Sequence, residues 1–166
     1  MLPLIQTLFQ IVLFRKGPEH IPRSGVLLAM TIVLWLVTGL AQIVLTDRGS
    51  EAGIVIDIFS ALLAVICYLA ILIAFGKSER LTQMITAALG CSALLLTAFT
   101  FCFLLARLMG SQTMVAVFFW IYLPWAIAVR GHIIARAIDR HWYLGLVFAV
   151  LIFVLQYVAV NFLRAP

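Results

Sequence analysis

Apolar residues form five long runs along the chain, and short polar connectors separate them. Each run exceeds the roughly 20 residues that cross a bilayer as a helix, and a helix satisfies its own backbone hydrogen bonds in lipid. The connectors leave no room for an extramembrane domain and favour antiparallel packing of consecutive helices. The pattern therefore predicts an all-α fold, a single membrane domain that forms an integral membrane bundle of five transmembrane helices at about residues 24–46, 52–75, 81–108, 113–140 and 142–163.

A shorter amphipathic segment precedes the first run, at residues 1–14. Its apolar residues fall near one helical face, while Gln6 and Gln10 form a narrow polar strip. It is too short to span a bilayer, so we expect an interfacial helix that lies along the membrane surface rather than a disordered start. The basic segment that follows, RKGPEHIPRS, contains Pro18 and Pro22, which break the helix.

The composition agrees with a lipid environment. Hydrophobic residues make up 66% of the 166 residues and charged residues only 10%. Together with a mean hydropathy of +1.22, this leaves too little polar surface to coat a soluble globule. The net charge of +5 could indicate nucleic acid binding, but the basic residues lie within a turn or two of apolar runs. Attraction to the anionic headgroups of membrane lipids explains the charge better, so we expect no nucleic acid partner.

Lysine and arginine fall mostly in every second connector. Five crossings would divide them between the two sides of the membrane, with Arg15, Lys16, Arg23, Lys77, Arg80, Arg130, Arg136 and Arg140 on one side against Arg48, Arg107 and Arg164 on the other. The side richer in these residues is normally cytoplasmic. This predicts a multi-pass protein with its N-terminus in the cytoplasm and its C-terminus outside. The short connectors favour the bacterial cytoplasmic (inner) membrane.

No segment carries a catalytic, metal-binding or cofactor-binding signature. The chain lacks the G-x-S-x-G and H-E-x-x-H patterns, close carboxylate pairs within a run, and a glycine-rich phosphate loop. Cys67, Cys91 and Cys102 lie inside predicted helices without C-x-x-C spacing, which favours a packing role over a metal site or a disulfide relay. We therefore expect no enzyme activity, no cofactor and no metal.

The end of the fourth run, AVRGHIIARAIDRH, is a candidate binding surface. A helix of about 28 residues extends about 42 Å, longer than a hydrocarbon core of about 30 Å, so its last turns should stand in the cytosolic headgroup layer. Arg136 and Asp139 could pair at i, i+3. The surface could bind a lipid phosphate or an acidic partner, or serve only as a topology anchor. Its residues are His132, Arg136 and Arg140, spaced four apart, with Arg15, Lys16 and Arg23 from the same side.

A second candidate is an intramembrane polar site in the outer half of the bundle. Asp57 lies about five residues into the second run and is the only acid in the apolar part of any run. Acids at such a depth are costly and often mark function. Arg107 in the third run and Gln156 in the fifth map to the same half. These three residues could form a proton or solute site, or a structural ion pair, or the arginine could simply snorkel to the interface.

Aromatic residues flank a proline within the fourth run, as Trp120, Tyr122, Pro124 and Trp125. Proline removes one backbone hydrogen bond and tends to kink a helix. The kink and its aromatic neighbours could line a lipid-sized or ligand-sized groove, or could pack against other helices. Small residues spaced four apart, such as Gly145 and Ala149, would let helices approach closely.

The order of these features resembles the Yip-like family of small bacterial inner-membrane proteins. The resemblance rests on the amphipathic start, the segment RKGPEHIPRS, five tightly connected runs, and a fourth run that continues into WAIAVRGHIIARAI with Gly131, His132 and Arg136. It implies a five-helix membrane protein that acts as a binding or organising component, in eukaryotes with small GTPases and vesicle machinery. The Asp-Leu-Tyr-Gly-Pro type of motif that marks eukaryotic members is missing, which argues against a GTPase partner.

Two functions from different classes follow from these patterns. The first is a non-enzymatic accessory subunit, scaffold or assembly factor that binds other membrane proteins and lipid. The alternative is a small transporter or channel that uses the polar residues around Asp57. A homo-oligomer would favour the alternative, because five helices alone rarely enclose a path. A membrane enzyme that acts on lipid ranks third.

Overall fold

The chain is helical throughout the residues that its structure describes. The computed structural model describes residues 2–45 and 51–164, and the side chains of residues 2, 3, 51–54, 57 and 164 fall outside the description. Within these limits there is no strand, which confirms the all-α prediction. The elements are α1 (Leu2–Val12), η1 (Pro18–His20), α2 (Gly25–Leu45), α3 (Glu51–Ala74), η2 (Ser78–Arg80), α4 (Leu81–Leu108), α5 (Gln112–Ala137) and α6 (Trp142–Arg164).

Four of these helices are long and apolar enough to cross a membrane, namely α2, α4, α5 and α6. In α3, which runs for 24 residues, the stretch Ile58–Ala74 is apolar within the described part of the chain. Gly76 and Gly110 follow the ends of α3 and α4 with φ of 65° and 66°. Because glycine has no Cβ, it adopts this left-handed conformation without strain and lets the chain leave a helix sharply.

The end of α5 differs from the prediction. The apolar run predicts a helix to about residue 140, but α5 ends at Ala137. Asp139 takes a left-handed conformation with φ of 53°, and the Arg140 N–H donates to the Ala135 carbonyl at 2.9 Å. This is the hydrogen bond of a Schellman motif, which usually has glycine or asparagine at the left-handed position. An aspartate there gives no compositional sign that the helix stops.

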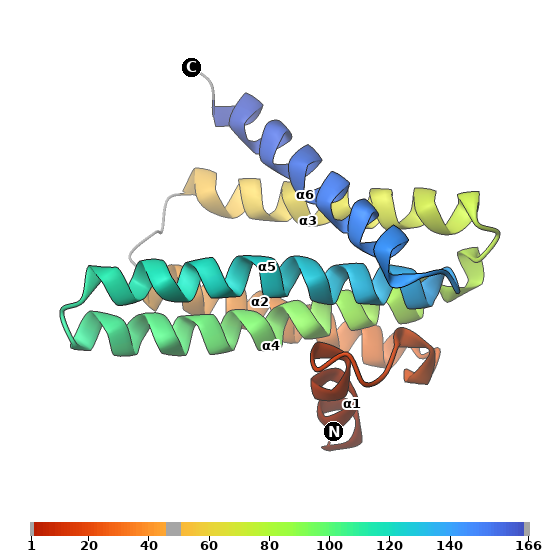
Figure 1. Ribbon diagram of the computed structural model, residues 1–166, viewed down its shortest axis with the longest axis horizontal. Coiled ribbons are helices and arrows are strands. Elements are labelled where there is room, and N and C mark those ends of the chain that lie inside the picture. The colour runs from red at the N-terminus through yellow and green to blue at the C-terminus, as the bar shows by residue number, and fades with distance from the viewer. Residues whose placement is uncertain (1, 46–50, 165–166) are drawn as a thin grey trace.

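α4 holds the arrangement together. It packs along both α2 and α5, and α6 crosses α5 (Figure 1). α3 packs mainly on α6, and over their described residues α2 and α3 make few contacts although they follow one another. The prediction that short connectors make consecutive helices packing neighbours is therefore wrong for this pair.

The crossing of α5 and α6 depends on glycine in both helices. A Cβ on Gly145 would meet the carbonyl oxygen of Gly131 and would lie 2.6 Å from the backbone nitrogen of Ala135. One on Gly131 would lie 2.8 Å from the Cα of Leu146. Ala149, one turn after Gly145, is 2% exposed. The close packing predicted at Gly145 and Ala149 is confirmed, and it brings the backbones of the two helices into contact.

α1 runs crosswise to α4 at one end of the bundle (Figure 1). Leu8 and Ile11 are 1% and 0% exposed, and a Cβ on Gly90 of α4 would lie 2.7 Å from Leu8 Cδ1. On the other face of α1, Ile5 and Phe9 are 51% and 58% exposed. α1 therefore presents apolar side chains both to the bundle and to its surroundings.

Candidate functional site

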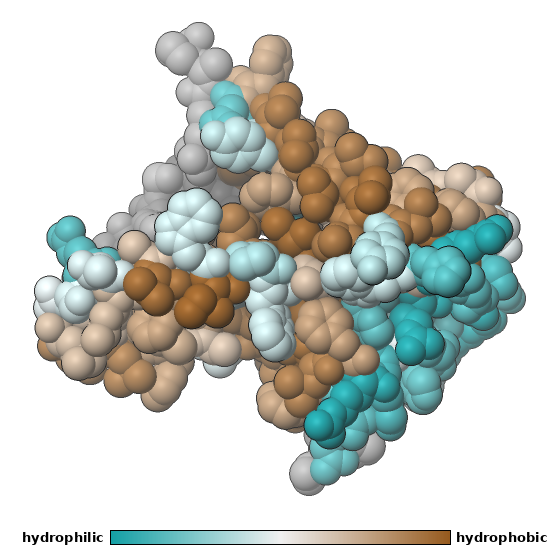
Figure 2. Space-filling view, in the orientation of Figure 1, coloured by the Kyte–Doolittle hydropathy of each residue, from teal (hydrophilic) through white to brown (hydrophobic). Residues whose placement is uncertain are grey.

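Hydrophilic residues gather at the end of the molecule near η1 and η2, while most of the remaining visible surface is hydrophobic (Figure 2). At this end Asp139 forms ion pairs with Arg80 at 2.8 Å and with Lys77 at 2.9 Å. Arg80 also donates to the Ala137 carbonyl at 3.3 Å, which caps the last turn of α5. The hydrogen bond from Arg80, and then that from Lys77, holds the pKa of the Asp139 carboxyl below its ordinary value. The predicted pairing of Asp139 with Arg136 is therefore wrong.

His132 belongs to the protein interior. It is 6% exposed, and its Nε2 lies 2.9 Å from the carbonyl oxygen of Lys16. The ring of Phe14 packs edge-on against the imidazole, with centroids 5.4 Å apart. The predicted row of His132, Arg136 and Arg140 on one helix face is therefore wrong, because His132 is buried and Arg140 lies beyond the end of α5. His132 instead joins the N-terminal segment to α5.

The other predicted basic residues are divided between internal and exposed positions. Lys16 is partly buried, and Arg23 forms an ion pair with Glu79 at 3.4 Å. The Arg23 Nε also donates to the side-chain oxygen of Gln83 at 3.4 Å. Arg23 is itself exposed. We call the other three exposed arginines the basic surface, namely Arg15, which follows α1, Arg136, in the last turn of α5, and Arg140, which follows α5.

Of the predicted intramembrane site at Asp57, Arg107 and Gln156, the structure describes the side chains of Arg107 and Gln156, and it does not bring these two together. The Asp57 side chain lies outside the described residues, so its predicted role stays a prediction. Gln156 lines a cavity between the helices, which we call the central cavity. Arg107 lines a second one, farther from the basic surface, which we call the distal cavity. Arg107 and Gln156 therefore belong to different cavities.

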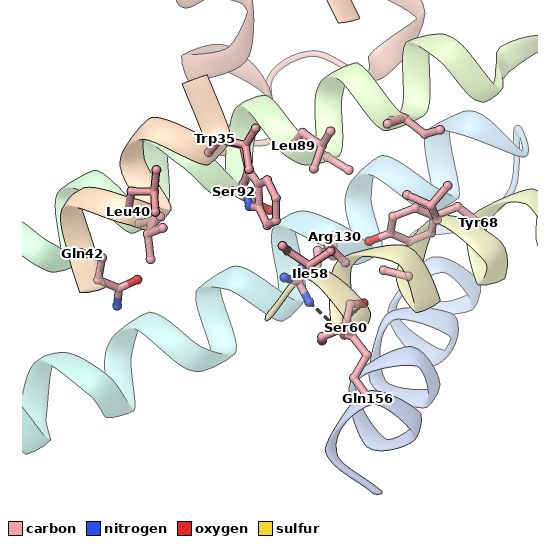
Figure 3. A pocket seen from close by; sticks show the side chains of 18 of the residues that line it. Trp35, Leu40, Gln42, Ile58, Ser60, Tyr68, Leu89, Ser92, Arg130 and Gln156 are labelled. Carbon is pink, nitrogen blue, oxygen red and sulfur yellow. Dashed lines mark hydrogen bonds between the residues drawn. The ribbon is translucent and has the colours of Figure 1, made fainter. Parts of the chain in front are cut away.

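The central cavity has a volume of about 280 Å³, and its walls come from α2, α3, α4, α5 and α6 (Figure 3). Much of the wall is apolar, with Trp35, Ile58 and Leu89 among its side chains. A small number of polar groups in apolar walls is the usual form of a ligand site. The polar and tyrosine side chains that line it are Gln42, Ser60, Tyr68, Ser92, Tyr122, Arg130 and Gln156.

Arg130 brings a positive charge into the central cavity. It lies seven residues before the end of α5, about 10 Å along the helix. Its Nη1 donates to Gln156 Oε1 at 3.4 Å, and Gln156 Nε2 donates to the carbonyl and hydroxyl oxygens of Ser60 at 2.8 and 2.9 Å. A guanidinium carries five N–H donors. Among the described side chains no carboxylate lies within ion-pair distance of Arg130, so it is held by a neutral amide.

The sequence pattern placed Arg130 among the cytosolic charges and missed its place in the cavity. The position of Arg130 around the helix could have distinguished it from the exposed cytosolic arginines. Arg130 precedes Arg136 by six residues, which puts the two side chains about 120° apart on an α-helix. Arg136 is exposed, whereas Arg130 is partly buried and faces the central cavity.

The distal cavity has a volume of about 850 Å³ and lies between α2, α4 and α5. Gln42, Leu96 and Tyr122 line both cavities, so the two adjoin. Of the two alternatives for the aromatic residues of the fourth run, a groove or packing against other helices, Trp120 and Tyr122 fit the first, because both line this cavity. Trp125 instead packs against Phe14, with ring centroids 5.7 Å apart. The aromatic wall of the distal cavity consists of Phe99, Phe103, Phe119, Trp120 and Tyr122.

Metal ligands and cysteines add no further site in the part of the chain that the structure describes. No three side chains of His, Cys, Asp or Glu are grouped there to hold a metal ion. Cys67, Cys91 and Cys102 are free thiols, and Cys91 packs in the core, 1% exposed.

Comparison with known proteins gives no assignment. The chain matches no family model, no curated protein and no solved structure. The resemblance to the Yip-like family therefore stays a prediction. The candidate site is therefore defined by the structure alone, and it consists of Arg130 and the two adjoining cavities.

Proposed function

We propose that the chain is a non-enzymatic integral membrane protein that works by binding, as an accessory subunit, scaffold or assembly factor of a membrane complex. The observation that carries this proposal is Arg130, a charged group held inside a mostly apolar cavity by a neutral amide. An ionisable residue within a transmembrane helix is costly and commonly marks a functional site. We assign to the central cavity a compact anionic group of a ligand or partner.

The energetics of Arg130 favour an anion over a neutral ligand. An arginine at the centre of a transmembrane helix costs about 2.5–3.5 kcal/mol on translocon insertion scales, and Arg130, about two turns inside the end of α5, carries part of this cost. The contact with Gln156 is 3.4 Å long, beyond the usual range for N–H···O bonds, and therefore offsets little of this cost. A carboxylate or phosphate would offer charge-assisted hydrogen bonds, often two to one guanidinium. The low dielectric of the cavity would strengthen their attraction.

The open side of the central cavity supports entry from lipid. α2 and α3 both line the cavity, and they make few contacts with each other over their described residues. Leu40 of α2 and Ile58 of α3 line the cavity although they are 51% and 44% exposed. The wall on this side is therefore open to the surroundings, which for a membrane helix are hydrocarbon. A ligand with an apolar part reaches Arg130 by this route.

The proposal includes five membrane crossings. α3 has 24 residues and extends about 36 Å, enough for the fifth crossing. The exposed Ile5 and Phe9 of α1 support an interfacial helix. We place the N-terminus in the cytoplasm and the C-terminus outside, in a bacterial inner membrane. In this orientation the basic surface of Arg15, Arg136 and Arg140 meets anionic headgroups.

Binding of a short anionic probe tests the central cavity. Protein in nanodiscs of zwitterionic lipid is titrated with octanoate, with octanol as the neutral match and empty nanodiscs as the blank. A hydrogen bond to a charged group contributes about 1.5–3 kcal/mol, so Arg130→Gln should weaken octanoate binding about tenfold to hundredfold. Arg136→Gln removes an exposed arginine of the same helix and should change it less than about twofold. Equal binding of octanoate by the wild type and Arg130→Gln contradicts the anion site.

Recovery of partner proteins tests the role as a subunit. Gentle detergent extraction, followed by identification of the proteins that co-purify, should recover the chain in a stoichiometric larger complex. A single monodisperse homo-oligomer would contradict the subunit role and favour transport. Anionic lipids that co-purify with the wild type should be reduced when the arginines of the basic surface are neutralised.

Transport is a second candidate function, favoured by the shared wall of the two cavities. Together the cavities follow α4 from Ile85 to Arg107, a distance of about 33 Å and close to the roughly 30 Å hydrocarbon core. A small transporter or channel would then use Arg130 in the role that the sequence predicted for Asp57. Proteoliposomes should take up octanoate with the wild type and with Arg136→Gln, but not with Arg130→Gln. If uptake is no faster than in empty liposomes, transport is contradicted and binding remains the proposed function.

A further inference from the structure

We infer that the ligand of the central cavity is a single-chain anionic amphiphile, with its carboxylate or phosphate against Arg130 and its apolar chain in the distal cavity. The inference rests on the proposed anion site and adds the chemical class of the ligand. It also gives the distal cavity a function, which a small anion at Arg130 alone would not.

The junction of the two cavities defines the shape of this ligand. Gln42 of α2, Leu96 of α4 and Tyr122 of α5 line both cavities, so one molecule can occupy both. The central cavity, at about 280 Å³, is at the lower limit of small-molecule sites, which range over about 300–1,000 Å³. The distal cavity, at about 850 Å³, is well within that range. A compact head group and a larger apolar remainder match these two sizes.

The walls of the distal cavity suit an apolar chain. From Leu96 to Arg107, α4 extends 11 residues, or about 16 Å, along this cavity. α5 contributes Val115 and Ala116, two small apolar side chains that leave room beside it. The rings of Phe99 and Tyr122 pack together with centroids 4.8 Å apart and form a firm aromatic surface at the junction.

The two arginines fix the orientation of the ligand. Arg130 is partly buried in the central cavity, where the attraction between opposite charges is screened least. Arg107 is exposed and precedes the last residue of α4, where water and salt screen charge. The anionic group therefore lies at Arg130, and the free end of the chain points toward Arg107.

Four probes separate the head group from the chain, namely palmitate, hexadecyl phosphate, hexadecanol and octanoate. Each is titrated into the protein in zwitterionic nanodiscs, with empty nanodiscs as the blank. Palmitate and hexadecyl phosphate should bind at least about tenfold more tightly than hexadecanol, which lacks the charge. Arg130→Gln should weaken palmitate and octanoate alike, and Arg107→Gln should weaken palmitate less than Arg130→Gln does. Arg136→Gln, which removes an exposed arginine that lines neither cavity, should leave both unchanged.

Obstruction of the distal cavity tests the position of the chain. Ala116→Trp fills part of this cavity, and overpacking of this kind should weaken palmitate binding about tenfold while octanoate binding stays unchanged. Unchanged octanoate binding also shows that the variant folds. Val115→Phe narrows the same wall by a smaller volume and replaces Ala116→Trp if the latter does not fold.

Each outcome bears on one part of the assignment. If Ala116→Trp binds palmitate as the wild type does while Arg130→Gln still loses octanoate, the chain does not occupy the distal cavity and only the anion site stands. If hexadecanol binds as tightly as palmitate, the ligand is not anionic. If Arg107→Gln, and not Arg130→Gln, loses palmitate, the ligand lies in the opposite direction and the assignment is overturned.

Discussion

Replacement of Gly145 by alanine tests the crossing of α5 and α6, on which the position of Gln156 beside Arg130 depends. The added Cβ would lie 2.6 Å from both the Cβ and the backbone nitrogen of Ala135, and it would meet the Gly131 carbonyl oxygen. These neighbours are backbone atoms or are fixed directly to the backbone, so none can rotate away. The two helices must therefore move apart to accept one methyl group.

Two opposing terms set the size of this effect. Overpacking costs about 1–3 kcal/mol, and alanine gains about 1 kcal/mol over glycine in helix propensity. The free energy of unfolding should therefore fall by up to about 2 kcal/mol. In a chain of 166 residues this lowers Tm by up to about 8 °C. Gly39→Ala in α2 is the matched control, because a Cβ there meets no atom within 4 Å and only the propensity term acts.

Thermal unfolding in detergent, followed by circular dichroism, measures both variants. Gly145→Ala should have the lower Tm, and Gly39→Ala should equal or exceed the wild type. A Tm for Gly145→Ala at or above that of Gly39→Ala would refute the contact between the two helices.

Three further outcomes are expected. Because the pKa of Asp139 is lowered in the folded state, its ion pairs stabilise the fold above the ordinary value of 3.8, and this contribution is lost as the pH falls through the lower folded pKa. Thermal unfolding at decreasing pH should show this loss of stability in the wild type and not in Asp139→Asn. Because Asp139 is half exposed, the loss should be under about 1 kcal/mol. Leu8→Ala should loosen α1 by about 2–5 kcal/mol and expose it to protease, whereas Phe9→Ala should not, since Leu8 is 1% and Phe9 58% exposed. Neutralising Arg136 and Arg140 should weaken co-purification of anionic lipid by about 1 kcal/mol per residue, and topology mapping should find the orientation unchanged.

The apolar runs predicted most of the helices because, in lipid, the length and polarity of a segment decide whether it forms a spanning helix. The turns after α3 and α4 could also be predicted from the sequence, because Gly76 and Gly110 lie where the backbone takes a left-handed conformation. The end of α5 was missed because Asp139 takes the same conformation without glycine. Local composition thus predicts a helix end only where the residue type is the usual one for its backbone conformation.

Helix partners and the site could not be read from the runs. Hydropathy indicates that a segment lies in the membrane, but lipid and a neighbouring helix are equally apolar, so it does not indicate which one a face meets. Helical spacing suggested Arg136 as the partner of Asp139, and depth in the membrane suggested Asp57 and Arg107 as neighbours of Gln156. The partners of Asp139 and Gln156 in the structure, Lys77 and Ser60, are set by the way α3 packs against α6 and α4.

The predicted orientation of the chain does not require Arg130. Without it, seven basic residues remain on the predicted cytoplasmic side against three on the other, so the charge bias still has the same sign. An apolar residue at this position would also remove the cost of a guanidinium about two turns inside α5. Neither topology nor stability therefore explains an arginine whose described partner is a neutral amide. The anion that we propose for the central cavity would account for it, because a negative charge would turn this costly group into a favourable contact.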